Sequence, residues 1–422
     1  MNLLDDLRWR NSIAQTTDLE ALSGELNKGG ISFYLGFDPT APSLHIGNLV
    51  ALVVMKRFQL AGHRPIPLVG GATGLVGDPS GRNQERTLND EDVVAAWVER
   101  IKNQLTGFLD FETGANRAIM ANNLDWTAGL SAIGFLRDVG KHFSVNQMLA
   151  RDSVSSRLES GGISYTEFSY QVLQAYDFLE LHRRLDCVLQ IGGSDQWGNI
   201  IAGVDLIRRV EGKSAHALTI PLLTKADGSK FGKTASGSVW LDPEMTSPYA
   251  FFQFFLNSDD RDVIGLLKTF SFKSHDELEI LFSEHESNPG SRTAHRALAL
   301  EVTGYIHGFE AARKVEEAAR ALFGQSEIRE LDQETLLSAI AELPRIEIDG
   351  TSSLSWIDLM AASPLMGSKS AARRIVNEGG AYLNNQKVSD EATVLESSDF
   401  LHGQVALLRK GKRDLLAVVK KA

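Results

Sequence analysis

Residues 34–48 read Y-L-G-F-D-P-T-A-P-S-L-H-I-G-N, and this stretch decides the fold. The apolar run Ile31–Phe37 ends at Asp38-Pro39, which predicts a short buried strand closed by a turn. We expect this strand to be central and parallel. Ser43 is the expected N-cap of a following helix, whose apolar face continues to Ala61-Gly62.

The start of that helix is a candidate nucleotide-binding corner. His45 and Asn48 fall in its first turn. The first backbone N–H groups of a helix lack internal partners and favour a bound phosphate. Gly47 would let a flat base lie against the backbone. At this point an ordinary connector remains open as the alternative, with Gly47 as a helix defect that costs about 1 kcal/mol.

Length and charge limit the classes of protein to consider. A chain of 422 residues exceeds the length at which one core stops growing, roughly 250 to 300 residues, so two or three domains are expected. The net charge of −11 means that any contact with nucleic acid must use local basic patches rather than the overall field.

Cysteine content and the N-terminus bear on location. Cys187 is the only cysteine, which excludes an intramolecular disulfide, and its apolar neighbours predict a buried packing residue. The N-terminal residues M-N-L-L-D-D-L-R-W-R carry acids where a secretory signal would be cationic. The apolar run Leu49–Met55 is well short of the roughly 20 residues that span a bilayer. We expect a cytoplasmic protein with no membrane segment.

The pattern of the first strand recurs along the chain. Expected strands at 63–69, 186–191 and 218–223 run into the loops G-G-A-T-G-L-V-G-D-P-S-G, G-G-S-D-Q-W-G-N and K-A-D-G-S-K-F-G-K-T. Asp78, in the first of these loops, is placed to accept hydrogen bonds from an amine or a ribose hydroxyl. Repeated units of this kind predict an α/β fold with a doubly wound parallel sheet, whose ligands bind at the carboxyl ends of the strands.

Two helices are predicted from periodicity, over 90–109 and 168–182. In the second, Tyr170, Gln174 and Asp177 stand at positions i, i+4 and i+7 and share one face. Simple solvent exposure of that face remains open as the alternative.

The C-terminal part has a different composition. Residues 248–323 predict a helical domain, 324–350 an acidic and irregular linker, and 351–422 a small α+β domain that is basic where the rest is acidic. Residues 368–388 read as a capped helix, a Gly-Gly stop and a strand with an Asn-Asn turn. The charge asymmetry points to RNA, with these candidate contacts: Lys369, Arg373, Arg374, Arg409, Lys410 and Lys412.

Two short motifs carry a resemblance to a known family. His45-Ile46-Gly47-Asn48 resembles the HIGH signature of class I aminoacyl-tRNA synthetases, and Lys230-Phe231-Gly232-Lys233-Thr234 resembles KMSKS. Each is weak alone, but their places after the first and last expected strands make the pair specific. The chain resembles the bacterial tyrosyl-tRNA synthetases over nearly its whole length, with a catalytic domain over 1–247. Its tail resembles an RNA-binding domain shared with a ribosomal small-subunit protein.

The resemblance implies an activity and a set of partners. The chain would join L-tyrosine to ATP, release pyrophosphate, and pass tyrosine to the 3′ end of tRNA(Tyr). Magnesium would arrive with ATP, with no tightly bound cofactor and no protein metal site. An insertion at about 110–160 would form the interface of a homodimer.

The family also implies residue roles at matching positions. The tyrosine-binding set is Tyr34, Asp78, Tyr170, Gln174, Asp177 and Gln196, in which Asp177 accepts the phenol. The ATP-binding set is Gly36, Asp38, His45, Gly47, Asn48, Gly193, Asp195, Lys230, Phe231, Gly232, Lys233 and Thr234. The catalytic set is Thr40, His45, Lys230 and Lys233, with Arg82 and Arg86 on a mobile loop that would meet the pyrophosphate. For Arg82, a solvated surface loop is the alternative.

Two other interpretations are a tryptophanyl-tRNA synthetase and a silent RNA-binding protein that kept the fold. A tryptophan pocket would not need Tyr34 and Asp177 as a phenol-binding pair. A silent descendant would be free to lose His45 or the paired lysines. All of these residues are present.

Overall fold

The computed structural model describes residues 2–80, 89–151, 154–155, 157–158, 162–234, 237–341, 343–349, 354–411 and 414–421. The chain divides into two compact units. The first unit is Met1–Thr246 with Ser258–Leu298, and the second is Ser247–Asn257 with Ala299–Ala422. They divide between them the segment 248–323 that was expected to be one helical domain.

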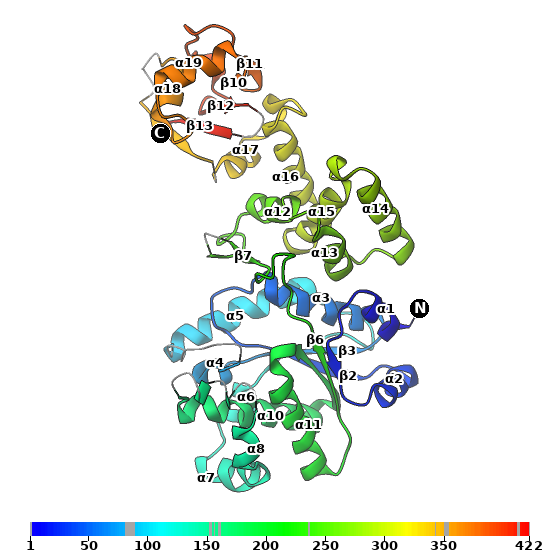
Figure 1. Cartoon of the computed structure of the whole chain (residues 1–422). Helices are drawn as coiled ribbons and strands as arrows, with labels where there is room; N and C mark the ends of the chain where they lie inside the picture. The colour runs from blue at the N-terminus through cyan, green and yellow to red at the C-terminus, as the bar shows by residue number, and fades with distance from the viewer. Residues whose placement is uncertain are drawn as a thin grey trace. The chain divides into compact units, whose positions relative to one another are not determined.

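The first unit is built on a six-stranded sheet of order β1-β6-β5-β2-β3-β4 (Figure 1). Its strands are β1 (Gln15–Thr16), β2 (Ser32–Phe37), β3 (Arg64–Val69), β4 (Ala121–Asn122), β5 (Cys187–Gly193) and β6 (His216–Ile220). All neighbours are parallel except β1 and β6. The chain runs outward from β2 through β3 and β4, then continues on the other side with β5 and β6. This is the predicted doubly wound sheet, and its order reverses between β2 and β5.

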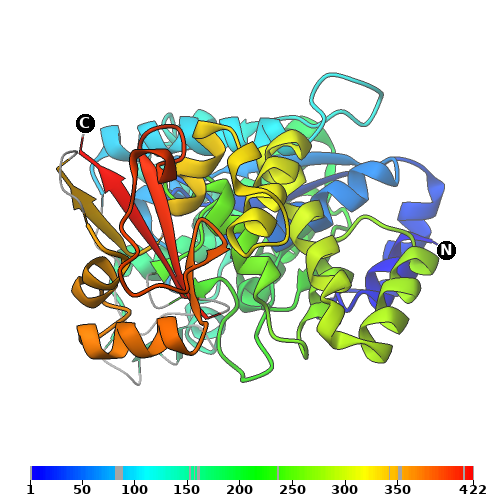
Figure 2. The ribbon, with the colours of Figure 1, turned by 90° about the horizontal axis from the view of Figure 1, so that it is seen from above.

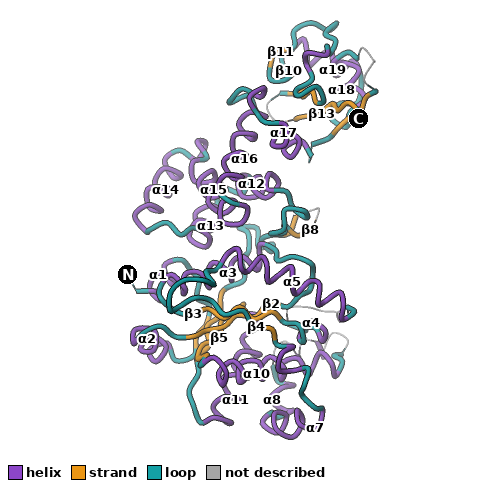
Figure 3. Tube along the Cα trace, turned by 180° about the vertical axis from the view of Figure 1, so that it is seen from behind, coloured by secondary structure: helices purple, strands orange, loops and turns teal. Residues whose placement is uncertain are grey.

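Helices cover both faces of this sheet. The helices α3 (Ile46–Leu60) and α5 (Glu91–Phe108) lie on one face, and α10 (Tyr165–Leu185) and α11 (Trp197–Glu211) lie on the other, as the opposite views of Figures 1 and 3 agree. The N-terminal helices are α1 (Leu3–Trp9) and α2 (Leu19–Lys28), and α4 (Thr73–Val76) follows β3. The expected helices at 90–109 and 168–182 are confirmed.

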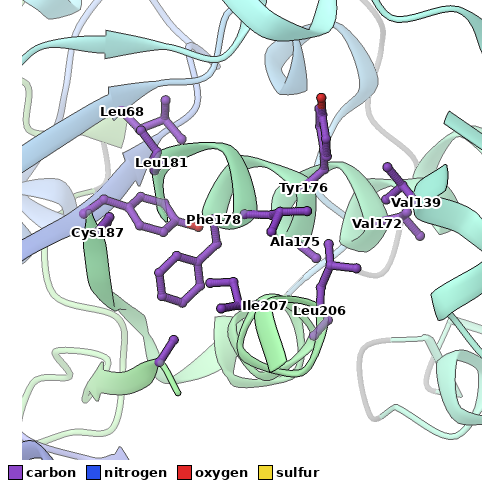
Figure 4. Close-up of a cluster of buried hydrophobic side chains, with 14 of the residues drawn as sticks. Leu68, Val139, Val172, Ala175, Tyr176, Phe178, Leu181, Cys187, Leu206 and Ile207 are labelled. Carbon is purple, nitrogen blue, oxygen red and sulfur yellow. The ribbon is translucent and has the colours of Figure 1, made fainter. Parts of the chain in front are cut away.

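The layer between sheet, α10 and α11 holds a buried apolar cluster. Figure 4 shows Ala175 and Phe178 of α10 pointing toward Leu206 and Ile207 of α11. Cys187 is fully buried in the same cluster, and burial raises the pKa of its thiol. The prediction that it is a packing residue is confirmed.

Short helices fill the insertion between β4 and α10. They are α6 (Leu124–Thr127), α7 (Ala132–Gly134), η1 (Phe135–Val139), η2 (Gly140–His142) and α8 (Val145–Leu149). The rest of the first unit contains η3 (Ser194–Gln196), the hairpin β7 (Lys233–Thr234) and β8 (Gly237–Ser238), α13 (Val263–Phe270), α14 (His275–Ser287) and η4 (Pro289–Ser291). The unit boundary falls within α15 (Thr293–His307).

The second unit combines helices with a five-stranded sheet of order β11-β10-β12-β13-β9. Its strands are β9 (Arg345–Ile348), β10 (Ala381–Leu383), β11 (Gln386–Lys387), β12 (Val405–Lys410) and β13 (Asp414–Lys420). Its helices are α12 (Pro248–Leu256), α16 (Phe309–Leu322), η5 (Ile328–Glu330), α17 (Gln333–Ile340), α18 (Trp356–Ala362), α19 (Lys369–Asn377) and η6 (Ser397–Asp399). Figure 2 shows α18 and α19 in orange beside the red strands, and Trp356 is fully buried in the core they share.

The C-terminal part of the chain confirms some expectations and corrects one. Ser368 caps α19, and the Asn384-Asn385 turn has φ angles of 47° and 66°, as a tight hairpin requires. The irregular linker expected over 324–350 is wrong in part, because α17 and β9 form there and β9 pairs in parallel with β13. Its acidic composition hid a strand in which Ile346 and Ile348 alternate with the exposed Glu347 and pack on the core.

The first unit also departs from expectation at its edges. The N-terminal segment contains strand β1 as well as two helices, and β1 pairs antiparallel with β6. Within the described residues, no helix combines the length and the apolarity needed to cross a membrane.

Candidate functional site

A cavity of about 880 Å³ opens at the carboxyl ends of β2, β3, β5 and β6. This is where a doubly wound sheet binds ligands, next to the reversal of strand order. The cavity brings together residues that the sequence placed far apart. Those expected at the site that line it are Tyr34, Gly36, Asp38, Thr40, His45, Gly47, Asn48, Asp78, Tyr170, Gln174, Asp177, Gly193, Asp195, Gln196, Lys230, Phe231 and Gly232.

Tyr34 and Asp177 line a buried part of the cavity. Tyr34 projects from β2 with its side chain 1% exposed, and its hydroxyl has no hydrogen-bond partner among the described residues. Asp177 of α10 is 2% exposed. Burial, with the nearby Asp177 charge, raises the pKa of Tyr34 well above its ordinary value. The two side chains thus place a phenol and a carboxyl group near each other in the cavity wall.

Two donors hold the Asp177 carboxylate in place. Trp126 Nε1 donates to Oδ1 at 2.9 Å and Asn123 Nδ2 donates to Oδ2 at 3.0 Å. Burial raises the pKa of Asp177 to about 7, although both hydrogen bonds favour the charged form. The carboxylate is therefore oriented before any ligand enters.

The same network continues to the other side of the cavity. Asn123 Nδ2 also donates to Thr73 Oγ1 at 2.9 Å, and Thr73 Oγ1 donates to Asp38 Oδ1 at 2.6 Å. Tyr170 donates its hydroxyl to the other oxygen of Asp38 at 2.6 Å. The turn after β2, helix α4, the loop after β4 and helix α10 are therefore connected by buried and part-buried hydrogen bonds.

Thr73, Asn123 and Trp126 were not predicted as site residues from the sequence. The one available signal was the polar pair Asn122-Asn123 after the short apolar run 118–121, at the end of a strand too short to be recognised. Trp126 gave no signal, because a tryptophan near a helix start is usually a packing residue.

A second polar group lies beside Tyr170. Gln196 Nε2 donates to Asp78 Oδ2 at 2.6 Å, and Asn199 Nδ2 donates to Gln196 Oε1 at 3.1 Å. Burial raises the pKa of Asp195, and the neighbouring Asp78 charge adds to this effect. Gln174 Oε1 is buried with no partner among the described residues. This part of the cavity offers acceptors suited to an ammonium group.

The start of α3 differs from the prediction. His45, not Ser43, is the N-cap: His45 Nδ1 accepts from Asn48 N at 3.3 Å, and Asn48 Oδ1 accepts from His45 N at 3.0 Å. Ser43 instead donates to Leu44 O at 2.7 Å. The reciprocal bonds satisfy the backbone N–H groups of His45 and Asn48, so the Asn48 side chain fixes the His45 backbone while the Asn48 backbone N–H holds the His45 ring. A Cβ on Gly47 would lie 2.8 Å from His45 Cε1, which explains the glycine.

The loop that carries the second motif lies against the first. Ile46 N donates to Val239 O at 3.0 Å, and a Cβ on Gly232 would touch Ile46 at 3.4 Å. The Phe231 ring packs on Phe270 with centroids 6.2 Å apart. Lys230 is exposed and lines the cavity. The backbone of Lys233-Thr234 forms β7, while their side chains lie outside the described part of the chain.

Three other expected site residues, Arg82, Arg86 and Lys412, also lie outside the described residues. In the second unit, Lys369, Arg373 and Arg374 are exposed on α19, where they pair with Asp358, Glu391 and Glu378 respectively. They remain accessible candidates for contact with RNA.

Arg409 and Lys410 are placed differently from expectation. Arg409 is 9% exposed, its guanidinium lies 3.9 Å from the centroid of the Tyr382 ring, and its Nη1 donates to Gly411 O at 2.7 Å. Burial lowers the pKa of Arg409. Its position argues against direct contact with RNA, since packing and a backbone bond already use the guanidinium. Lys410 is half-buried and donates to Leu365 O at 3.3 Å.

Comparison with known proteins agrees with this geometry. Residues 26–324 match the family model of class I tRNA synthetases (W and Y), and residues 335–418 match that of the tyrosine–tRNA ligase SYY-like C-terminal domain. The tyrosine–tRNA ligase of Streptomyces avermitilis is 57% identical over 419 residues, covering 99% of this chain and 98% of its own. That of Acidothermus cellulolyticus is 56% identical over 420 residues, covering 99% of each chain.

A solved structure shows the same fold. A C-terminally truncated mitochondrial tyrosyl-tRNA synthetase from Aspergillus nidulans superposes with a TM-score of 0.69 at 31% identity, over 76% of this chain and 94% of that one. The chain therefore belongs to the class I tRNA synthetases of the tryptophan and tyrosine type. Within that class it falls in the tyrosine–tRNA ligases, enzymes that use ATP to charge tRNA with tyrosine. The interpretation as a tyrosyl-tRNA synthetase is confirmed, and the two other interpretations are not supported.

The buried Asp177 predicts a pH dependence of stability. Its pKa rises from 3.8 to about 7 on folding, so the folded protein holds this proton more tightly. The resulting stabilisation is complete below pH 4 and is lost as the pH rises to about 7. The Asp177→Asn side chain is neutral at every pH, so the variant should lack this pH-dependent contribution. The melting temperature of the wild type minus that of the variant should therefore decrease as the pH rises from 4 to 7. Thermal unfolding of the ligand-free proteins measures this, with the surface variant Asp205→Asn as control. A difference that stays constant or grows with pH would contradict the assignment.

Proposed function

We propose that the cavity holds L-tyrosine with its phenol between Tyr34 and Asp177 and holds ATP against the start of α3. One observation carries the proposal, namely the buried Tyr34 hydroxyl without a partner in the described chain, at the same cavity as the pre-oriented Asp177 carboxylate. Tyrosine would donate its phenol proton to Asp177 and accept from Tyr34. Phenylalanine would leave the buried Tyr34 hydroxyl unpaired and would give the Asp177 carboxylate no third hydrogen bond, which is costly.

The amino-acid end of the substrate would lie beside the second polar group. Asp78, Tyr170 and Gln174 line the cavity with acceptor oxygens that suit the α-ammonium group, and Gln196 orients Asp78 through its hydrogen bond. This arrangement fixes tyrosine at both ends. Its carboxylate would then face the segment that begins α3.

ATP would occupy the other part of the cavity. Gly47 lines the cavity where the adenine would lie, and Gly193 and Asp195 line it where the ribose would lie. Gly36, Asp38, Asn48, Phe231 and Gly232 complete the ATP-binding part. Thr40, His45 and Lys230 would face the phosphates, and by family likeness Lys233, Thr234, Arg82 and Arg86 join them. Magnesium would arrive bound to ATP, because this ion usually keeps its waters and phosphate ligands.

The reaction needs no protein nucleophile. An oxygen of the tyrosine carboxylate forms a bond to the α-phosphorus, and the bond from that phosphorus to the bridging oxygen breaks, which releases pyrophosphate. A ribose hydroxyl of tRNA then attacks the adenylate carbonyl and AMP leaves. Positioning and cations aimed at the developing charge accelerate such steps. The N-terminus of α3 adds partial positive charge at the same place.

We also propose a homodimer that works in the cytoplasm. Large apolar side chains stay exposed on the short helices of the insertion, with Ile133 at 73%, Val145 at 59% and Leu136 at 53%. Apolar patches of this kind usually mark interaction sites. The family likeness of the insertion makes a second copy of the chain the partner. The basic residues of α19 would contact tRNA(Tyr).

The phenol assignment predicts how Tyr34→Phe changes amino-acid selection. In the variant the Tyr34 hydroxyl is no longer there to be left unpaired when phenylalanine binds, so the cost of binding phenylalanine decreases and discrimination against it should fall. Tyrosyl-tRNA synthetases are themselves the established example of such selection, with rejection of about 10⁵-fold. Pyrophosphate-exchange kinetics with both amino acids measure the ratio, and Tyr165→Phe removes the same atom from an exposed ring as control. Discrimination equal to that of the wild type would refute the assignment.

The loop assignment predicts a selective defect for Lys230→Ala. A cation that meets the pyrophosphate as charge builds acts on the transition state and hardly on tyrosine binding. The rate of adenylate formation should therefore fall by about 10²-fold or more, as for loss of one stabilising donor, while tyrosine affinity stays near that of the wild type. Lys225→Ala, in the same loop but outside the cavity lining, is the matched control. Equal losses in rate and in tyrosine affinity would show that the loop is structural.

The basic C-terminal part predicts that the two half-reactions are separable. A chain that ends at Gly324 lacks α17 to β13 and should still exchange pyrophosphate with tyrosine, because the whole cavity lies in the first unit. Transfer to tRNA should weaken, and its salt dependence should flatten, since phosphate contacts release counterions. Parallel loss of both activities, or full retention of charging, would contradict this.

A further inference from the structure

A buried charged cluster in the first unit lies outside the cavity lining. It contains Asp6 and Arg10 from the N-terminal helix and its cap, Arg57 from the last turn of α3, and His275 from α14. Arg10 is 3% exposed and Arg57 is 6% exposed. Fully buried arginines are rare unless they are paired, so the contacts of these two guanidinium groups need an explanation.

Both guanidinium groups bind backbone carbonyls where α13 ends. Arg57 Nη2 donates to Ser271 O at 2.5 Å, and more weakly to Thr269 O at 3.3 Å. Arg10 Nη1 donates to the same Ser271 O at 3.0 Å and to Lys268 O at 3.2 Å. The last carbonyls of a helix lack internal partners and carry partial negative charge, which two cations complement.

A single carboxylate completes the arrangement. Asp6 Oδ1 accepts from Arg10 Nε at 2.7 Å and from His275 Nε2 at 2.9 Å, while Oδ2 lies 3.6 Å from Arg57 Nη1. Burial would raise the pKa of Asp6, but these hydrogen bonds hold it below its ordinary value. Trp9 stacks on His275 with centroids 3.8 Å apart. We call Asp6, Arg10 and Arg57 the carbonyl clamp.

Helix α13, which the clamp holds, also contacts both ends of the segment 226–231, which contains Lys230 and which we call the lysine loop. At the start of α13, Asp262 Oδ1 accepts from Ala226 N at 2.8 Å. At its end, Phe270 is fully buried and packs on Phe231, the residue after Lys230. Arg57 itself belongs to α3, whose first turn carries His45 and Asn48. Helix α13 and the clamp therefore connect the two signature segments through residues that, apart from Phe231, do not line the cavity.

We propose that the carbonyl clamp positions the lysine loop for adenylate formation, with Arg57 as the principal positioning residue. By fixing the C-terminal end of α13 relative to α3, it holds Phe231, and with it Lys230, at the phosphate side of the cavity. Displacement of a reacting group by about 1 Å can cost 10²-fold in rate even when the cause is remote. This inference rests on the proposed role of Lys230.

The geometry indicates that the clamp sets the orientation of α13 and does not simply attach it to α3. Apolar packing would hold α13 to α3 without desolvating two guanidinium groups, which is costly. A planar fork on specific carbonyls instead fixes the rotation and register of the helix, and lysine cannot reproduce this fork. Arg57→Lys keeps the charge and loses the fork, so it separates the two roles.

The experiment compares full-length wild type with Arg57→Lys. Single-turnover adenylate formation should slow by about 10- to 100-fold, while tyrosine dissociation constants stay within about twofold. Hydrogen exchange should accelerate in peptides covering 223–234 and stay unchanged in peptides covering 165–185. Arg8→Gln removes an exposed arginine from the same N-terminal helix and should change neither readout.

A second variant, Arg10→Lys, covers the case in which Arg57→Lys does not fold, and it should shift both readouts in the same direction. Adenylation within twofold of the wild type, or a proportional loss of tyrosine affinity, would overturn the inference. Failure of the proposed function is recognised separately. If Lys230→Ala forms adenylate at the wild-type rate, Lys230 has no role in the reaction, whereas hydrogen exchange of peptides covering 223–234 in Arg57→Lys still tests whether the clamp positions the loop.

Discussion

A carboxylate buried without a cationic partner is expensive, and Asp177 is such a group among the residues that the structure describes. The protein stabilises it with two neutral donors, Asn123 and Trp126, rather than with an arginine. This choice matters for function. A paired cation would occupy the oxygens, whereas two neutral donors orient the carboxylate and leave it able to accept one more hydrogen bond. The network from Asp177 through Asn123 and Thr73 then connects this carboxylate to Asp38 at another part of the cavity wall.

The sheet topology explains why one cavity can serve two substrates. The strand order reverses between β2 and β5, so their carboxyl ends open a crevice flanked by helices that cover opposite faces. In the proposed arrangement, helix α10 would supply Tyr170, Gln174 and Asp177 for tyrosine from one face, and α3 would supply its N-terminus for ATP from the other. The bond from Ile46 N to Val239 O keeps the two signature segments adjacent.

The sequence was informative wherever function depends on local pattern. The strand at 32–37 and the helix bearing Tyr170 and Asp177 could be predicted because each is set by periodicity or by neighbours in the chain, whereas the paired motifs were recognised by their resemblance to the family signatures. Thr73, Asn123 and Trp126 could not, since they meet Asp38 and Asp177 only through strand order. Ser43 was preferred over His45 as the cap because capping statistics favour serine, whereas the reciprocal bond to Asn48 decided the outcome.

Contacts between side chains and distant backbone carbonyls also could not be predicted from the sequence, because they depend on the tertiary fold. Arg57 and Ser271 are 214 residues apart, and a carbonyl carries no side-chain identity to recognise. The central claim, that the cavity selects a phenol, is tested most directly by ATP–pyrophosphate exchange with each of the twenty amino acids. The account predicts strong exchange with tyrosine alone, with phenylalanine and tryptophan lower by several orders of magnitude. Comparable exchange with either of those two would contradict it.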